Sequence, residues 1–163
     1  MKKQSKLTSE LILQLNKGEI EARNLEETLA IDFAEFLKYV VPNINIKNLE
    51  VFKASKLGIT TKMKLAAQIL YEQFQKDIIE QLLTHKSDTG RGIVAYIIAL
   101  IPNLNIKETL ELIEPLARDK HFGVREWAWL GVREKVSSNL IEAIEILKTW
   151  SKNSDENIRR FAS

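Results

Sequence analysis

Hydrophobic residues recur at intervals of three and four along almost the whole chain, while the strict alternation typical of strands is missing. This spacing is that of the buried face of an amphipathic helix. The first such stretch predicts a helix near 24–41, ended by Pro42, whose stripe is Leu25, Leu29, Phe33, Phe36, Leu37 and Val40. Further helices are predicted near 46–57, 60–84 (as one helix or two), 90–101, 106–118, 121–137, 139–152 and from 155 onward.

The second half of the chain contains an internal repeat. LIEPLARDKHFGVREWA, from Leu112, aligns without a gap with ILKTWSKNSDENIRRFA, from Ile146, at an offset of 34 residues. Arg125 then falls on Arg159 and Trp127 on Phe161, and a fainter upstream copy places Arg91 under Arg125. Helix pairs that recur at a fixed period stack on one another, because one pair cannot bury its apolar face alone. We therefore expect an all-α fold, an α-solenoid of antiparallel helix pairs (a HEAT-like or armadillo-like superhelix), and a single domain over 1–163.

Composition narrows the range of functions only slightly. The chain has no cysteine, which excludes disulfides, thiolate nucleophiles and zinc fingers, and its net charge is only +2. The first 36 residues carry five basic and seven acidic side chains, and the remainder carries 19 basic and 15 acidic ones. This mild asymmetry is compatible with a polyanion on the later part. No apolar run is long enough to cross a membrane or to form a signal peptide, so we expect a cytoplasmic protein without membrane attachment.

The repeat resembles a known motif. EPLARDKHFGVREWA is similar to a HEAT repeat, with Pro115 in its first helix, a short acidic turn, and a hydrophobic–arginine pair that opens the second helix. VREWAW and IRRFAS most resemble DNA alkylation repair proteins of the AlkC/AlkD type, which are alkylpurine DNA glycosylases. The resemblance covers about 60–163 well and the N-terminal third loosely. It implies a monomer that binds duplex DNA on its concave face and excises N3- or N7-alkylated purines without a metal or another cofactor.

The last residues predict that the chain is the N-terminal part of a longer protein. The sequence stops at Ser163, about two turns into a helix whose counterpart in the preceding repeat continues past Val132. A solenoid that ended there would expose half a repeat and would lack a polar cap. A further tryptophan that the family has in a later repeat would then lie beyond Ser163.

The predicted helix at 121–137 interleaves aromatic and charged residues. Stepping about 100° per residue from Val124 places the core stripe at one side and puts Trp129 about 140° away from its start. A cationic alkylpurine would need aromatic faces, which attract it by roughly 1–2 kcal/mol when desolvated, and an anionic carboxylate beside the sugar. It would also need arginines on the phosphates. The core stripe comprises Val124, Trp127, Ala128, Gly131 and Val132.

The resemblance assigns roles to this helix and to the next repeat. Phe122 followed one turn later by Glu126 matches the family's aromatic and acidic residues, although the AlkD branch has an aspartate there. The family arginine that grips the backbone corresponds best to Arg160, with Arg159 as the alternative. The expected sets are Glu126 as the catalytic carboxylate, Phe122, Trp127 and Trp129 against the substrate, and Arg125, Arg133, Arg159 and Arg160 on DNA.

Each role has a structural alternative. Trp127 also suits core packing, Glu126 a solvated helix position, and Trp129 packing against the neighbouring repeat. Arg125 and Arg159 occupy the place of the HEAT arginine that bonds the preceding acidic turn, at Asp119 or Asp155. His85 and His121 lack partners with metal-ligand spacing, and SDTGRG, from Ser87, lacks the lysine and the spacing of a P-loop. The alternative function is therefore a non-catalytic HEAT scaffold for a protein partner or for undamaged DNA.

Overall fold

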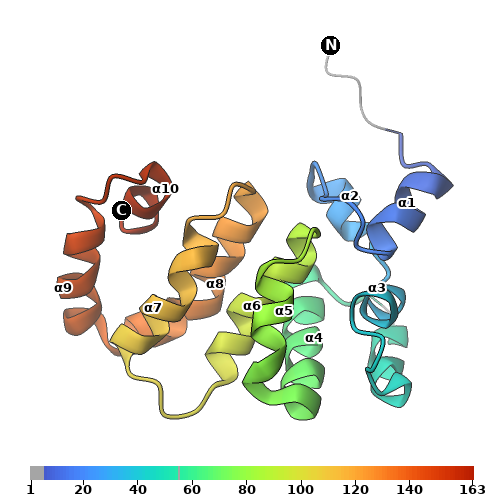
Figure 1. Cartoon of the computed structure of the whole chain (residues 1–163), viewed down its shortest axis with the longest axis horizontal. Coiled ribbons are helices and arrows are strands. Elements are labelled where there is room, and N and C mark those ends of the chain that lie inside the picture. Colours follow the sequence, from blue (N-terminus) through green and yellow to red (C-terminus); the bar gives the residue numbers. More distant parts are fainter. Residues whose placement is uncertain (1–5, 55) are drawn as a thin grey trace.

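The computed structural model describes residues 6–54 and 56–163, and within these ranges the chain is helical and contains no strand. The helices follow chain order across the molecule, from α1–α3 at one end to α9 and α10 at the other (Figure 1). Their bounds are α1 (Ser9–Asn16), α2 (Leu25–Leu29), α3 (Phe33–Val40), the 3-10 helix η1 (Ile46–Lys53), α4 (Ile59–Phe74), the 3-10 turn η2 (Gln75–Asp77), α5 (Ile78–Leu83), α6 (Asp88–Leu100), α7 (Ile106–Ala117), α8 (Phe122–Ser138), α9 (Leu140–Trp150) and α10 (Glu156–Phe161).

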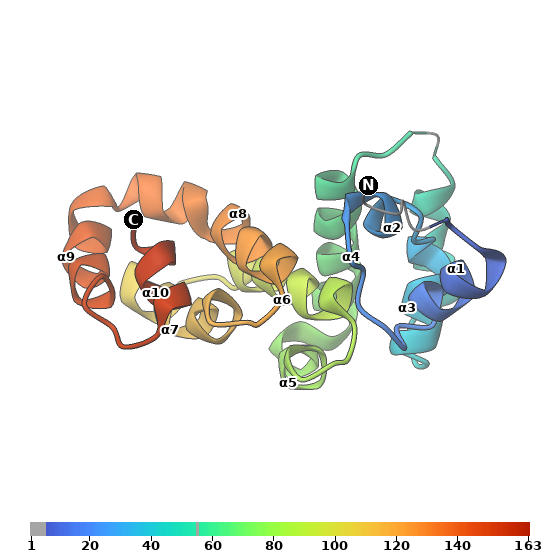
Figure 2. The same cartoon turned by 90° about the horizontal axis from the view of Figure 1, so that it is seen from above.

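Helix α6 lies at the centre of the molecule. It packs against α4 and α5 on one side and against α7 and α8 on the other. Every residue from Asp88 to Ile98 is buried, as expected of a helix surrounded by other helices. Seen from above, α4 and α8 lie on one side of the molecule and α5 and α7 on the other (Figure 2). The buried side chains form one hydrophobic cluster that extends from Leu15 to Ala143.

The predicted helices after residue 58 are confirmed, with bounds that differ by at most two residues. The stretch at 60–84 is two helices, and the chain turns between them at Gln75, whose φ is +53°. The helix predicted at 46–57 begins where expected but is a 3-10 helix, η1, that ends at Lys53. Helix α1 was not predicted. No helix of residues 6–54 and 56–163 is long and apolar enough to span a membrane.

The single helix predicted at 24–41 is wrong, because α2 and α3 are separate. The side chain of Asp32 accepts a hydrogen bond from the backbone N–H of Glu35 and thereby caps a new helix. The separation also changes what is buried. The apolar residues of α3 lie in the core, whereas Leu25 and Leu29 of α2 remain 63% and 51% exposed.

The 34-residue repeat recurs as local structure. Three arginines donate from Nη1 to the backbone carbonyl oxygens five and six residues upstream, at distances of 2.6–2.9 Å: Arg91, Arg125 and Arg159. Three residues at the same offset cap the helices that carry these arginines: Ser87, His121 and Asp155. Each unit thus ties the turn between two helices to the helix that follows it.

Candidate functional site

Helices α8 and α6 pack closely at two points, and each point has a glycine on one of the two helices. A Cβ atom on Gly131 would lie 2.7 Å from the carbonyl oxygen of Ala95, and one on Gly92 would lie 2.1 Å from the indole ring of Trp127. Both glycines therefore allow contacts that any larger residue would obstruct. The stripe predicted for α8 is largely confirmed, because Val124, Trp127, Ala128 and Val132 are buried, while Gly131 is half-buried.

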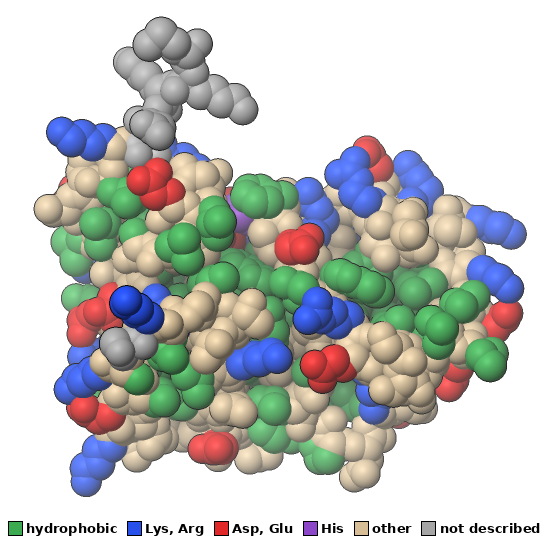
Figure 3. Space-filling model, turned by 180° about the vertical axis from the view of Figure 1, so that it is seen from behind, with side chains coloured by type: hydrophobic (Ala, Val, Ile, Leu, Met, Phe, Trp, Pro, Cys, Tyr) green, Lys and Arg blue, Asp and Glu red, His purple; other side chains and the backbone are tan. Residues whose placement is uncertain are grey.

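A cleft of about 990 Å³ runs along α8. Residues of α8, α9 and α10 line most of it, and the rest comes from α2, the starts of α4 and α6, the end of α7 and the turn before α8. Figures 1 and 2 place α4 and α8 on the far side of the view, and Figure 3 shows that hydrophobic side chains gather across the middle of this side, with charged side chains around them. The cleft is therefore a mainly apolar hollow with charged margins.

The two tryptophans of α8 both line this cleft but differ in burial. Trp127 is 8% exposed, because its ring rests on Gly92. Trp129 is 38% exposed and meets the ring of Phe161 edge-on, with 5.6 Å between the ring centroids. Phe161 also lines the cleft and comes from α10. Trp127 thus serves the core and the cleft together, while Trp129 and Phe161 form an aromatic corner between two repeats.

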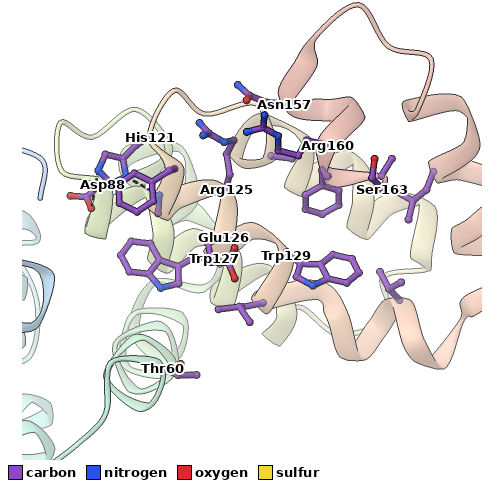
Figure 4. A pocket seen from close by; sticks show the side chains of 18 of the residues that line it. Thr60, Asp88, His121, Arg125, Glu126, Trp127, Trp129, Asn157, Arg160 and Ser163 are labelled. Carbon is purple, nitrogen blue, oxygen red and sulfur yellow. Dashed lines mark hydrogen bonds and ion pairs between the residues drawn. The ribbon is translucent and has the colours of Figure 1, made fainter. Parts of the chain in front are cut away.

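Glu126 lies in the same cleft, beside Trp127 and Trp129 in the close view (Figure 4). Its side chain is exposed, and it makes no hydrogen bond or ion pair with any other described residue. A carboxylate between two aromatic rings, without a cation of its own, suits a positively charged planar ligand.

The four arginines expected on DNA separate into two groups. Arg125 and Arg160 line the cleft, whereas Arg133 and Arg159 do not. Arg125 and Arg159 fill the structural place of the repeat arginine, but they bond the backbone carbonyls of the turn rather than the carboxylates of Asp119 or Asp155. Among residues 6–54 and 56–163, Arg160 pairs only with Glu156 of its own helix, at 3.0 Å. Arg160 is thus the cleft arginine that the fold constrains least.

Phe122 lines one end of the cleft, next to a polar cluster that the sequence analysis did not identify. Its ring is 58% exposed and stacks on His121, with 4.8 Å between the centroids. His121 accepts from the N–H of Gly123 at Nδ1, so its Nε2 carries the proton and donates to the carbonyl oxygen of Ala22 at 2.7 Å. His121 therefore has a structural role, because it caps α8 and joins this helix to the backbone at Ala22. No metal-binding group of acidic or histidine side chains occurs among residues 6–54 and 56–163.

Asp88 completes this cluster and also lines the cleft. Its Oδ1 accepts a hydrogen bond from the N–H of Ala22 at 2.9 Å, and its side chain is fully buried. Burial raises the pKa of the Asp88 carboxyl above its ordinary value, against the opposing effect of the Ala22 N–H. One sequence signal existed, since Asp88 stands 34 residues before Phe122, so an acid occupies a place that is aromatic in the next repeat.

Comparisons of the chain with protein family models, with curated proteins and with solved structures find no match. The resemblance to the alkylation repair proteins therefore rests on the residues of the chain itself.

Proposed function

We propose that the chain is a HEAT-like solenoid that binds duplex DNA along the α8 cleft and excises cationic N3- or N7-alkylated purines. The observation that carries this proposal is the convergence of Phe122, Glu126, Trp129 and Arg160 in one cleft. The solenoid arrangement is supported by the repeated caps and arginines and by the placement of α4 and α8 on one side and α5 and α7 on the other.

The chemistry of such a substrate matches these side chains. An alkylated purine carries a positive charge, so the bond from its nitrogen to the sugar C1′ is already weakened. As this bond breaks, its electron pair leaves with the purine, which becomes neutral, and positive charge develops on the sugar. The Glu126 carboxylate would stabilise that charge and accept a proton from the water that attacks C1′. The rings of Trp127 and Trp129 would attract the cationic base.

The arginines would hold the phosphate backbone against this carboxylate. Arg160 and Glu156 are each about 70% exposed, so their ion pair contributes little and can be exchanged for a phosphate contact. Arg125 uses Nη1 for the turn carbonyls yet still lines the cleft. We therefore propose Arg160 as the main backbone contact, with Arg125 beside it. Arg159 bonds its own turn outside the cleft and has no part in this contact.

The test is release of N7- and N3-methylated purines from methylated duplex DNA. The Glu126→Gln variant should lose roughly 100-fold or more in rate, because a preorganised charge at the reacting centre contributes on this scale. Glu134→Gln is the matched control, since Glu134 is an exposed glutamate of the same helix outside the cleft, and it should excise like the wild type. Unchanged excision by Glu126→Gln would refute the catalytic role.

The alternative is a non-catalytic HEAT scaffold, and one observation favours it. Leu140, Ile141 and Ile144 of α9 are 53%, 84% and 44% exposed beside the cleft, as is typical of surfaces that contact another protein. Under this alternative the wild type releases no methylated purine. DNA binding that weakens with salt, but without excision, would indicate phosphate contacts alone.

A further inference from the structure

Asp88 has more acceptor capacity than the fold uses. Its Oδ1 accepts from the N–H of Ala22, but its fully buried Oδ2 has no hydrogen-bond partner among the described residues. The nearest candidate is Nε2 of His121 at 3.6 Å, which is too long for a hydrogen bond. The proton on Nε2 is, in addition, already donated to the carbonyl oxygen of Ala22. The second carboxylate oxygen therefore remains available.

Anchoring Ala22 does not require an aspartate. The backbone N–H of Ala22 needs one acceptor oxygen, which an asparagine would supply without placing a charge in the interior. A buried acceptor without a partner disfavours folding, and a buried charge does so more strongly. The hydrogen bond from Ala22 thus accounts for Oδ1, whereas the negative charge and Oδ2 meet Nε2 of His121 at 3.6 Å, beyond hydrogen-bond distance.

The position of Asp88 supplies a reason for them. The residue opens the 13-residue helix α6 and lines the same cleft as Glu126. In the close view, Asp88 and His121 lie at one end of the cleft, Glu126 and Trp127 in the middle, and Trp129 with Arg160 toward the other end (Figure 4). Exposed Phe122 stacks on His121, which lies beside Asp88, and rotation of an exposed side chain is fast and inexpensive. A flat ligand over Trp127 would thus have a carboxylate at its edge as well as the Glu126 carboxylate.

We propose that Asp88 is a specificity-determining residue that accepts, at Oδ2, a hydrogen bond from the exocyclic amino group of a cationic purine. This inference rests on the proposed function and deepens it, because it names the part of the base that the cleft recognises. An ionised carboxylate can only accept, and the positive charge of an alkylated purine strengthens its amino group as a donor. Glu126 serves the sugar, and Asp88 serves the edge of the base.

The probes are 7-methylguanosine and 7-methylinosine at a pH that keeps both protonated at N1, where they carry the same positive charge and differ by the exocyclic amino group. Binding is followed by tryptophan fluorescence, since Trp127 and Trp129 line the cleft. The wild type should bind 7-methylguanosine about tenfold or more tightly, as expected for one charge-assisted hydrogen bond. Asp88→Asn keeps an acceptor for Ala22 but presents an amide N–H in place of Oδ2, so its two affinities should agree within about twofold.

The other variants separate this inference from the proposed function. Glu126→Gln should weaken both nucleosides and keep the preference, while Glu134→Gln should match the wild type. Equal affinities in the wild type, or a preference that survives Asp88→Asn, would overturn the role of Asp88 and leave cation binding intact. Failure of the wild type to bind either nucleoside would instead refute the proposed cleft function, and this inference with it. If Asp88→Asn does not fold, equal affinities in the wild type would still overturn the role of Asp88, and Asp88→Glu, which keeps the charge but displaces the oxygens, should reduce the preference.

Discussion

The contact between Gly92 and Trp127 predicts that Gly92→Ala destabilises the wild type but stabilises a variant that lacks the indole ring. A methyl group placed on Gly92 would lie 2.1 Å from Cε3 and 2.8 Å from Cζ3 of the indole ring. Trp127 is buried and cannot retreat without disturbing the packing of α6 against α8. Gly92→Ala should therefore combine a helix-propensity gain of about 1 kcal/mol with an overpacking cost of about 1–3 kcal/mol.

The net expectation is a loss of up to about 2 kcal/mol in the free energy of unfolding, or up to about 8 °C in Tm for a chain of this size. In a Trp127→Leu background the obstructing ring is gone, and the same substitution should stabilise by up to about 1 kcal/mol. This double-mutant cycle comprises the wild type, Gly92→Ala, Trp127→Leu and the double variant. Their stabilities are measured by urea and thermal denaturation, with far-UV circular dichroism as the signal, and the coupling energy should be roughly 2 kcal/mol. An equal loss in both backgrounds would show that Trp127 does not rest on Gly92.

Two further predictions concern buried charges. Arg91→Ala should cost about 3–5 kcal/mol in urea denaturation, because it removes the buried guanidinium's ion pairs with Asp119 at 2.7 Å and Glu21 at 2.6 Å and its hydrogen bonds to two turn carbonyls. Exposed Arg133 should tolerate alanine within about 0.5 kcal/mol, and a similar loss at both sites would contradict this view. Because burial raises the pKa of Asp88, the folded state binds its proton more readily than the unfolded chain does. The wild type should thus gain stability relative to Asp88→Asn as the pH falls from the raised pKa toward the ordinary value of 3.8, and a difference that stays constant across a pH series would exclude this linkage.

The sequence by itself determined the helices that are long and periodic. The bounds of α6 to α10 could be predicted because apolar spacing, caps and the 34-residue repeat are signals contained in the local sequence. The same local signal predicted the buried face of α8 and set Trp129 apart from it, whereas Phe122 and Glu126 were predicted from the family resemblance. It failed at residues 30–32, where the stripe continues through a break, because periodicity does not register that the side chain of Asp32 caps a new helix.

Only the tertiary structure decided which candidates share a site. Arg159 and Arg160 are adjacent in sequence, yet α10 directs one to its own turn and the other to the cleft. Asp88 meets Ala22 across 66 residues, and Trp129 meets Phe161 across a repeat boundary. Such contacts depend on how helices pack, and a buried carboxylate resembles a solvated one until its neighbours are known. Local periodicity specifies what each helix buries, whereas packing determines which polar groups are left facing the cleft.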